Sequence, residues 1–82
     1  MINKENVELL KKLVDIHIEN LAKEYPEYTT CVSAAAHSFS FCIFNSDSGD
    51  DVFKKRMNVK AANQDAVKFD LELCVKACGE WL

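Results

Sequence analysis

Apolar and polar positions alternate most clearly in the segment Ser38–Phe44, where bulky apolar residues are separated by serine and cysteine. An alternation with a period of two predicts a strand with one buried face. Three of the five phenylalanines of the chain fall in these seven residues. We therefore expect the hydrophobic core to form over Phe39, Phe41 and Ile43.

Residues 29–36 are expected to pair with this strand as a hairpin. Small side chains alternate along the segment, although its alanines are also compatible with a helix, and no Asn-Gly turn follows it. Alignment of the two apolar faces places Val32 opposite Phe41 and Cys31 opposite Cys42. A slip of one residue would set the phenylalanines against polar partners.

Residues 52–59 predict a third strand after the turn-forming segment 45–51. Phe53 and Met57 share one face of this strand. Lys55 falls on the same face, which indicates an edge strand or a bulge from which its amine can reach water.

Two amphipathic helices flank the strands. The first is expected over about residues 4–24, and the second from about Gln64 to the C-terminus; Asn3 and Asn63 are placed to cap them. The apolar stripe of the first helix is expected to comprise Val7, Leu10, Val14, His17 and Leu21, flanked by Leu9, Leu13 and Ile16. That of the second comprises Val67, Leu71, Cys74, Val75, Cys78 and Leu82.

These elements predict an α+β fold with two layers, in the order α-β-β-β-α. A three-stranded antiparallel meander carries both helices on the face with the phenylalanines. Residues 1–82 are expected to be a single domain, because a chain this short supplies one core. The wide apolar face of the first helix suggests a homodimer. The expected interface residues are Val14, His17, Leu21 and Phe44.

Charge and composition argue against some classes of function. A net charge of −3 argues against direct binding of nucleic acid. The element order is that of double-stranded RNA-binding domains, but residues 61–65 lack the basic start of the last helix that those domains carry. No apolar run could span a bilayer and no signal peptide precedes the first helix, so we expect a cytoplasmic protein without membrane contact.

No catalytic, metal or cofactor site is predicted. Cys74 and Cys78 face the core while Cys31 and Cys42 face away from it, so the four thiols do not suit one zinc ion and are expected to be free. His17 and His37 have no elbow or acid beside them. In the segment 45–51 the spacing of a calcium loop is not met. We therefore expect a protein that is not an enzyme.

The meander predicts one notable surface feature. The start of the first strand and the turn between the second and third strands should meet at one end of the sheet. We call the carboxylates expected there the acidic pole, which consists of Glu24, Glu27, Asp47, Asp50 and Asp51. It either serves solubility or mimics a run of phosphates and occupies a basic groove on another protein.

The leading hypothesis is a small acidic interaction protein that binds a protein partner through the acidic pole. In size and charge it is similar to small acidic inhibitors of bacteriophages and mobile elements, including inhibitors of CRISPR nucleases, an analogy that rests on no motif. The alternatives are a structural or assembly module that acts by homo-oligomerisation and a small thiol or metal-binding protein that uses Cys31 and Cys42. The sequence does not identify the partner.

Overall fold

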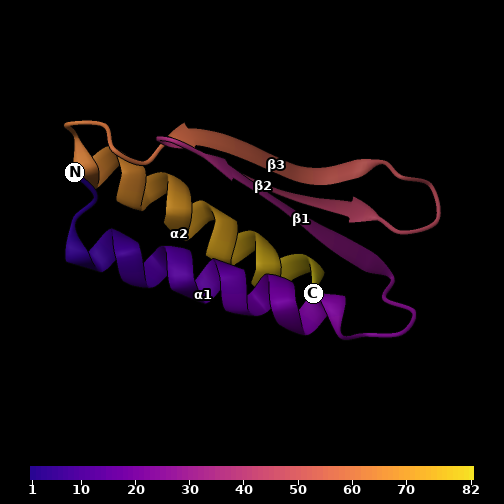
Figure 1. Cartoon of the computed structure of the whole chain (residues 1–82). Coiled ribbons are helices and arrows are strands. Elements are labelled where there is room, and N and C mark those ends of the chain that lie inside the picture. Colours follow the sequence, from indigo (N-terminus) through magenta and orange to yellow (C-terminus); the bar gives the residue numbers. More distant parts are fainter.

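A computed structural model describes residues 1–82 and shows the predicted element order. Its elements are α1 (Lys4–Leu21), β1 (Tyr28–Ala35), β2 (Ser38–Asn45), β3 (Asp51–Asn58) and α2 (Gln64–Trp81). The strands form one antiparallel sheet in the order β1-β2-β3. Both helices lie on the same face of the sheet and run in the same direction, with their N-termini at one end (Figure 1). The α+β fold with two layers is thus confirmed.

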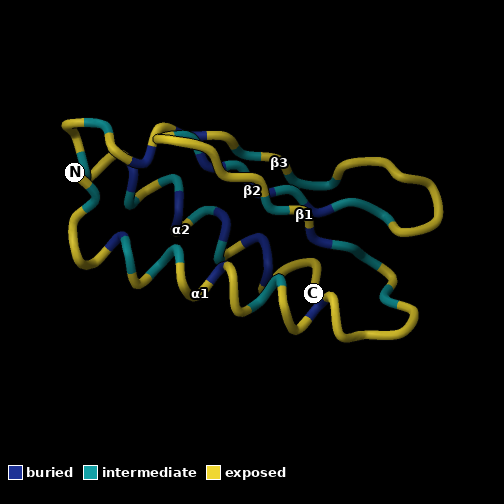
Figure 2. Tube along the Cα trace, viewed as in Figure 1, coloured by how far each residue is buried: buried dark blue, intermediate teal, exposed yellow.

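The core forms over β2, as its alternation predicts. Phe41 and Ile43 are fully buried and Phe39 nearly so. They belong to one cluster with Leu13 of α1 and Leu71 of α2. Burial of each large side chain contributes about 2–3 kcal/mol. Figure 2 shows that burial is concentrated between the helices and the sheet, while the loops at the far end of the strands are exposed.

The predicted register between β1 and β2 is also confirmed. Val32 lies opposite Phe41 and Cys31 opposite Cys42. Between β2 and β3 a bulge interrupts the ladder at Ile43/Phe44. Lys55 lies on the edge strand β3, where its amine forms an ion pair with Asp70 of α2 at 3.4 Å.

The helix α1 differs from the prediction in its end and in its buried face. It ends at Leu21, with Ala22 as its C-cap, and not at residue 24. Its fully buried positions are Asn6, Leu13 and Asn20, whereas Leu21 is 70% exposed. Leu9, Leu10, Leu13 and Ile16 contact the core as predicted. The hydrophobic pattern is wrong for Val14 and Leu21, because it assigns buried positions to apolar residues only and here two buried positions hold amides.

Each of the two asparagines ties α1 to another element. Asn20 Oδ1 accepts hydrogen bonds from the Thr30 amide (2.9 Å) and hydroxyl (3.1 Å), and Asn20 Nδ2 donates to the Tyr28 carbonyl (2.8 Å). Asn6 Nδ2 donates to the backbone carbonyl and the side-chain Oε1 of Gln64. Asn20 is bonded through both side-chain atoms, and Asn6 through Nδ2, whereas Asn6 Oδ1 is buried without a partner. The bonds made by the two side chains favour one rotation of the helix.

Gln64 connects three parts of the fold at the first turn of α2. Its Oε1 accepts from the Asn3 amide as well as from Asn6, and its Nε2 donates to the carbonyls of Val59 and Ala61. One side chain thus holds the start of α1 and the β3–α2 loop against α2.

The variant Gln64→Ala should lower the free energy of unfolding by about 2–3 kcal/mol, because it leaves several part-buried groups without partners. Urea-induced unfolding followed by circular dichroism measures the change. Glu72→Ala, at an exposed position of the same helix, should change it by less than about 0.5 kcal/mol. Equal effects of the two variants would contradict the role given to Gln64.

The β1–β2 hairpin turns through Ala36 and His37, and Ala36 has a φ of 50°, the only positive φ at a non-glycine residue. The backbone of a residue with a Cβ is strained at a positive φ. Glycine is therefore favoured at the first central position of such two-residue turns.

Ala36→Gly should therefore raise the free energy of unfolding by about 1 kcal/mol. The matched control Ala35→Gly, at an extended strand position, should lower it by about 0.5–1 kcal/mol. Thermal unfolding distinguishes the two, and a loss of stability in Ala36→Gly would show that the turn is not strained.

Candidate functional site

The acidic pole lies where the α1–β1 loop meets the β2–β3 turn. The Ser46 amide donates to the Glu27 carbonyl at 3.0 Å, and the hydroxyls of Thr29 and Ser46 are 2.7 Å apart. These bonds join the two segments. Glu24, Glu27 and Asp47 then line one hollow of about 560 Å³.

The other two carboxylates of the pole lie on the same turn and at the start of β3. Asp50 is exposed, and its carbonyl accepts from the Asn45 amide at 2.9 Å. Asp51 begins β3 opposite Phe44 and accepts a hydrogen bond from the Cys42 thiol at 3.0 Å. The structure therefore places three residues of the pole around the hollow, and the other two further along the same turn and at the start of β3.

The β2–β3 turn is held by its own side chains. Asn45 Oδ1 accepts from the amides of Asp47 and Ser48, and Ser48 Oγ accepts from the Asp50 amide. Gly49 has a φ of 78°, which a residue with a Cβ rarely adopts. The turn thus presents its carboxylates from an ordered backbone.

The charge of the pole is not neutralised within the chain. The three ion pairs of the structure are Lys11–Glu8, Lys55–Asp70 and Lys68–Glu5, and none includes a residue of the pole. All five of its residues are exposed. Grouped charges of one sign produce a field that attracts a positively charged surface and falls off with salt.

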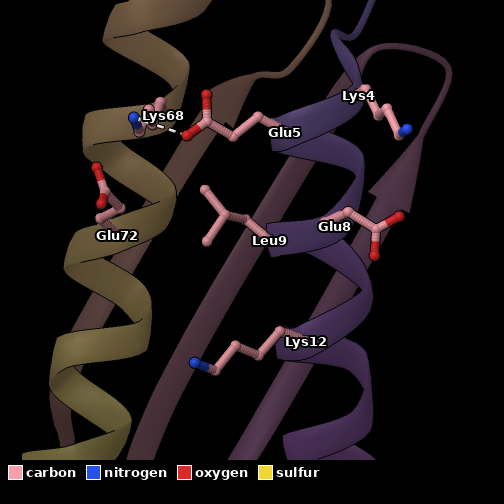
Figure 3. Close-up of a pocket in the computed structure, with 7 residues that line it drawn as sticks. All are labelled: Lys4, Glu5, Glu8, Leu9, Lys12, Lys68 and Glu72. Carbon is pink, nitrogen blue, oxygen red and sulfur yellow. Dashed lines mark ion pairs between the residues drawn. The ribbon is translucent and has the colours of Figure 1, made fainter.

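A second hollow, of about 550 Å³, lies between the N-terminal halves of the helices (Figure 3). Glu5, Leu9 and Lys12 point from α1 towards α2, and Lys68 closes on Glu5 with an ion pair of 2.7 Å. The remaining lining residues are Lys4, Glu8 and Glu72. Three lysines balance three glutamates here, so this groove favours neither sign of charge.

Lys68 in this groove keeps its proton. The hydrogen bond to Glu5 and the charge of that carboxylate raise the pKa of Lys68 above its ordinary value. A lysine nucleophile needs the opposite shift. The groove is therefore poorly suited to amine chemistry.

The cysteines do not form one site. Cys31 and Cys42 pair across β1 and β2, while Cys74 and Cys78 are buried under α2, and all four are free. Burial raises the pKa of Cys74 to about 12 and that of Cys78 to about 11. Burial, with the hydrogen bond and charge of Asp51, raises the pKa of Cys42 to about 11. These three thiols stay protonated at neutral pH, so they are weak nucleophiles and weak metal ligands.

The two histidines lie in different settings. His17 Nδ1 is 2.6 Å from the Thr30 hydroxyl. The same hydroxyl lies 3.1 Å from Asn20 Oδ1, so His17, Thr30 and Asn20 form one polar cluster. His37 is exposed in the hairpin turn. His17 thus has a partner in β1, and its side chain is only half-buried, so its place in an interface stays a prediction.

The other predicted interface residues do not form one surface. Val14 and Leu21 are exposed on α1, but Phe44 lies on the sheet face away from the helices, since it follows the buried Ile43. Ile18, which the sequence analysis does not include, is 56% exposed between Val14 and Leu21. The three form an exposed apolar stripe on α1. Val14, Ile18 and Leu21 are spaced by four and three residues, so they share one face of the helix. Recognition of Asn6 and Asn20 as buried would have shown that this face, with Ile18, is exposed.

Comparison of the chain with protein-family models, curated proteins and solved structures finds no match. Neither helix has the length and apolar character needed to cross a bilayer. No cluster of three histidine, cysteine, aspartate or glutamate residues is arranged to hold a metal ion.

Asp51→Asn should make Cys42 react faster with iodoacetamide. Removal of the carboxylate lowers the raised pKa of Cys42 towards its ordinary value of 9.0, and the thiolate is the reactive form. In a Cys31→Ser background, labelling of the parent should be slow at pH 8 and should rise as the pH approaches about 11.

Mass spectrometry of the labelled protein measures the rate, which should be several-fold higher at pH 9 in Asp51→Asn. Asp50→Asn, which removes a neighbouring charge without a bond to the thiol, is the control. A rate unchanged by Asp51→Asn would contradict the influence of this carboxylate.

Proposed function

We propose that this protein acts by binding another protein and not by catalysis, and that its acidic pole docks on a basic groove with which the partner binds nucleic acid. The observation that carries the proposal is the meeting of Glu24, Glu27 and Asp47 around one hollow, with Asp50 further along the same turn and Asp51 at the start of β3. None of these carboxylates forms an ion pair within the chain.

The ordered β2–β3 turn supports this proposal. Binding costs less conformational entropy when the backbone that carries the carboxylates is already fixed. Opposite charge across such an interface accelerates association and makes affinity depend on salt. A protein of this kind would inhibit its partner by occupying the path of the phosphate backbone.

A second candidate function is that of an assembly module which acts by self-association. It is favoured by the apolar stripe Val14, Ile18 and Leu21, which is exposed on α1 although it is made of core-type residues. Exposed apolar surface that is contiguous, and not scattered, is typical of an interface.

Reversal of charge at the acidic pole tests the first candidate. Glu24→Lys, Asp47→Lys and Asp50→Lys are combined in one variant. Asp15→Lys, Glu19→Lys and Glu72→Lys, exposed positions elsewhere, give a control of the same net charge. Each protein is immobilised and exposed to a lysate of its source organism, and retained proteins are identified by mass spectrometry.

We expect a nucleic-acid-binding protein to be retained by the parent and the control and lost by the pole variant. With the purified partner, the pole variant should raise the Kd at least tenfold and flatten its dependence on salt, and a short DNA or RNA duplex should compete with the parent. If both triple variants lose the same proteins, or neither loses any, the pole does not bind the partner.

A further inference from the structure

The two edges of the sheet are protected to different degrees. The edge strand β3 carries Lys54, Lys55 and Arg56 and is disturbed by a bulge, two features that prevent a further strand from pairing. The edge strand β1 has the sequence Tyr-Thr-Thr-Cys-Val-Ser-Ala-Ala, with no charge, proline or glycine. By the same criteria, β1 is open to pairing.

The first part of the β1 edge is already occupied by α1. The Asn20 amide bonds the Thr30 N–H and the Tyr28 C=O, and it takes the place of a neighbouring strand there. These backbone groups therefore point away from β2. Because the direction of backbone groups alternates along a strand, those of Val32 and Ala34 also point outward.

No element of the chain replaces Asn20 further along the strand. Figure 1 shows that β1 diverges from α1 in the direction of the β1–β2 hairpin. Cys31 and every residue from Ser33 to Ala36 are exposed. The open part of the edge is thus Cys31–Ala35, which is centred on Ser33.

We propose that this open edge binds the same edge of a second copy in antiparallel orientation, so that two three-stranded sheets form one continuous sheet. The proposal deepens the second candidate function. A two-fold axis at Ser33 sets Val32 of each copy opposite Ala34 of the other. Every side chain brought together is small and uncharged, so the edge is complementary to itself.

The apolar stripe of α1 lies on the side of this edge. Residues of α1 that face α2, such as Ile16 and Glu19, line the groove between the helices. His17 contacts Thr30 of β1. Val14, Ile18 and Leu21 lie next to His17 on the helix surface, on the side opposite to that groove. A strand added at β1 would therefore lie next to them and cover apolar surface along with the backbone edge.

The exposed area of the chain agrees with a modest interface. The chain exposes 5385 Å², whereas a folded monomer of 9.3 kDa exposes about 5,000 Å². The difference of about 400 Å² is roughly half of what one partner buries in a standard interface. We therefore expect a weak dimer that forms at high protein concentration. Its two acidic poles would lie at opposite ends of the joined sheet.

Disulfide trapping tests the register directly. Ser33→Cys is made in a Cys31→Ser, Cys42→Ser background, which removes the thiols of the open face. Residues that face each other at the axis without a backbone hydrogen bond have Cα atoms about 4.5 Å apart, within the range of a disulfide. Ser40→Cys, on the same face of β2, is the control, since its copies would be about 14 Å apart across three strand spacings.

Mild oxidation at 100 μM should cross-link most of the Ser33→Cys protein and little of the Ser40→Cys protein, as judged by non-reducing electrophoresis. In the parent sequence, sedimentation equilibrium should show a dimer. Ala34→Pro removes an outward N–H without loss of a bond to β2, and it should weaken the dimer at least tenfold while circular dichroism of the dilute protein stays unchanged.

The possible outcomes separate this inference from the function on which it rests. A dimer that survives Ala34→Pro and gives no Ser33 cross-link would overturn pairing through β1 and leave self-association standing. If the parent stays monomeric at 500 μM and the Ser33→Cys protein does not cross-link, both pairing through β1 and self-association are overturned. Neither result bears on the acidic pole.

Discussion

Burial of one face of β2 is the interaction on which the rest of the structure depends. Phe39, Phe41 and Ile43 leave water by packing in one cluster with residues of both helices. The chain buries few other large side chains, so loss of this contact would remove the reason for the helices to lie on the sheet. Everything else in the fold either orients that cluster or surrounds it.

Buried amides supply the orientation. Hydrophobic burial has no direction, so it can place α1 on the sheet but cannot fix its rotation. Asn6 and Asn20 fix it at the two ends of the helix, through Gln64 and through Thr30 and Tyr28. One consequence is that apolar residues of α1, among them Ile18 and Leu21, are turned towards water. The rotation of α1 that satisfies these amide hydrogen bonds also exposes the apolar stripe. This stripe is part of the basis for the proposed self-association.

The acidic pole and the β1 edge arise from the same meander but differ in physical character. The pole collects charge, so its binding would be long-ranged and sensitive to salt. The edge offers unpaired backbone groups and small neutral side chains, so its binding would be short-ranged and would require a matching strand. One small chain can therefore hold a charged surface for a partner and a separate surface for a second copy.

The sequence by itself determined the element order and the core face of β2. It also indicated the register with β1, because alternation with a period of two excludes every shift by an odd number of residues and the shortest hairpin loop then favours the observed pairing. It also predicted the convergence of Glu24, Glu27 and Asp47, since a meander returns its chain to the same end. Only the tertiary structure decided which face of α1 is buried, because Asn6 and Asn20 read as surface residues until their partners are known. Only the structure likewise showed that His17 is bonded to Thr30, that Phe44 lies on the face opposite α1, and that Asn20 covers just the first part of the β1 edge. These features depend on contacts between residues distant in sequence, which no local pattern specifies.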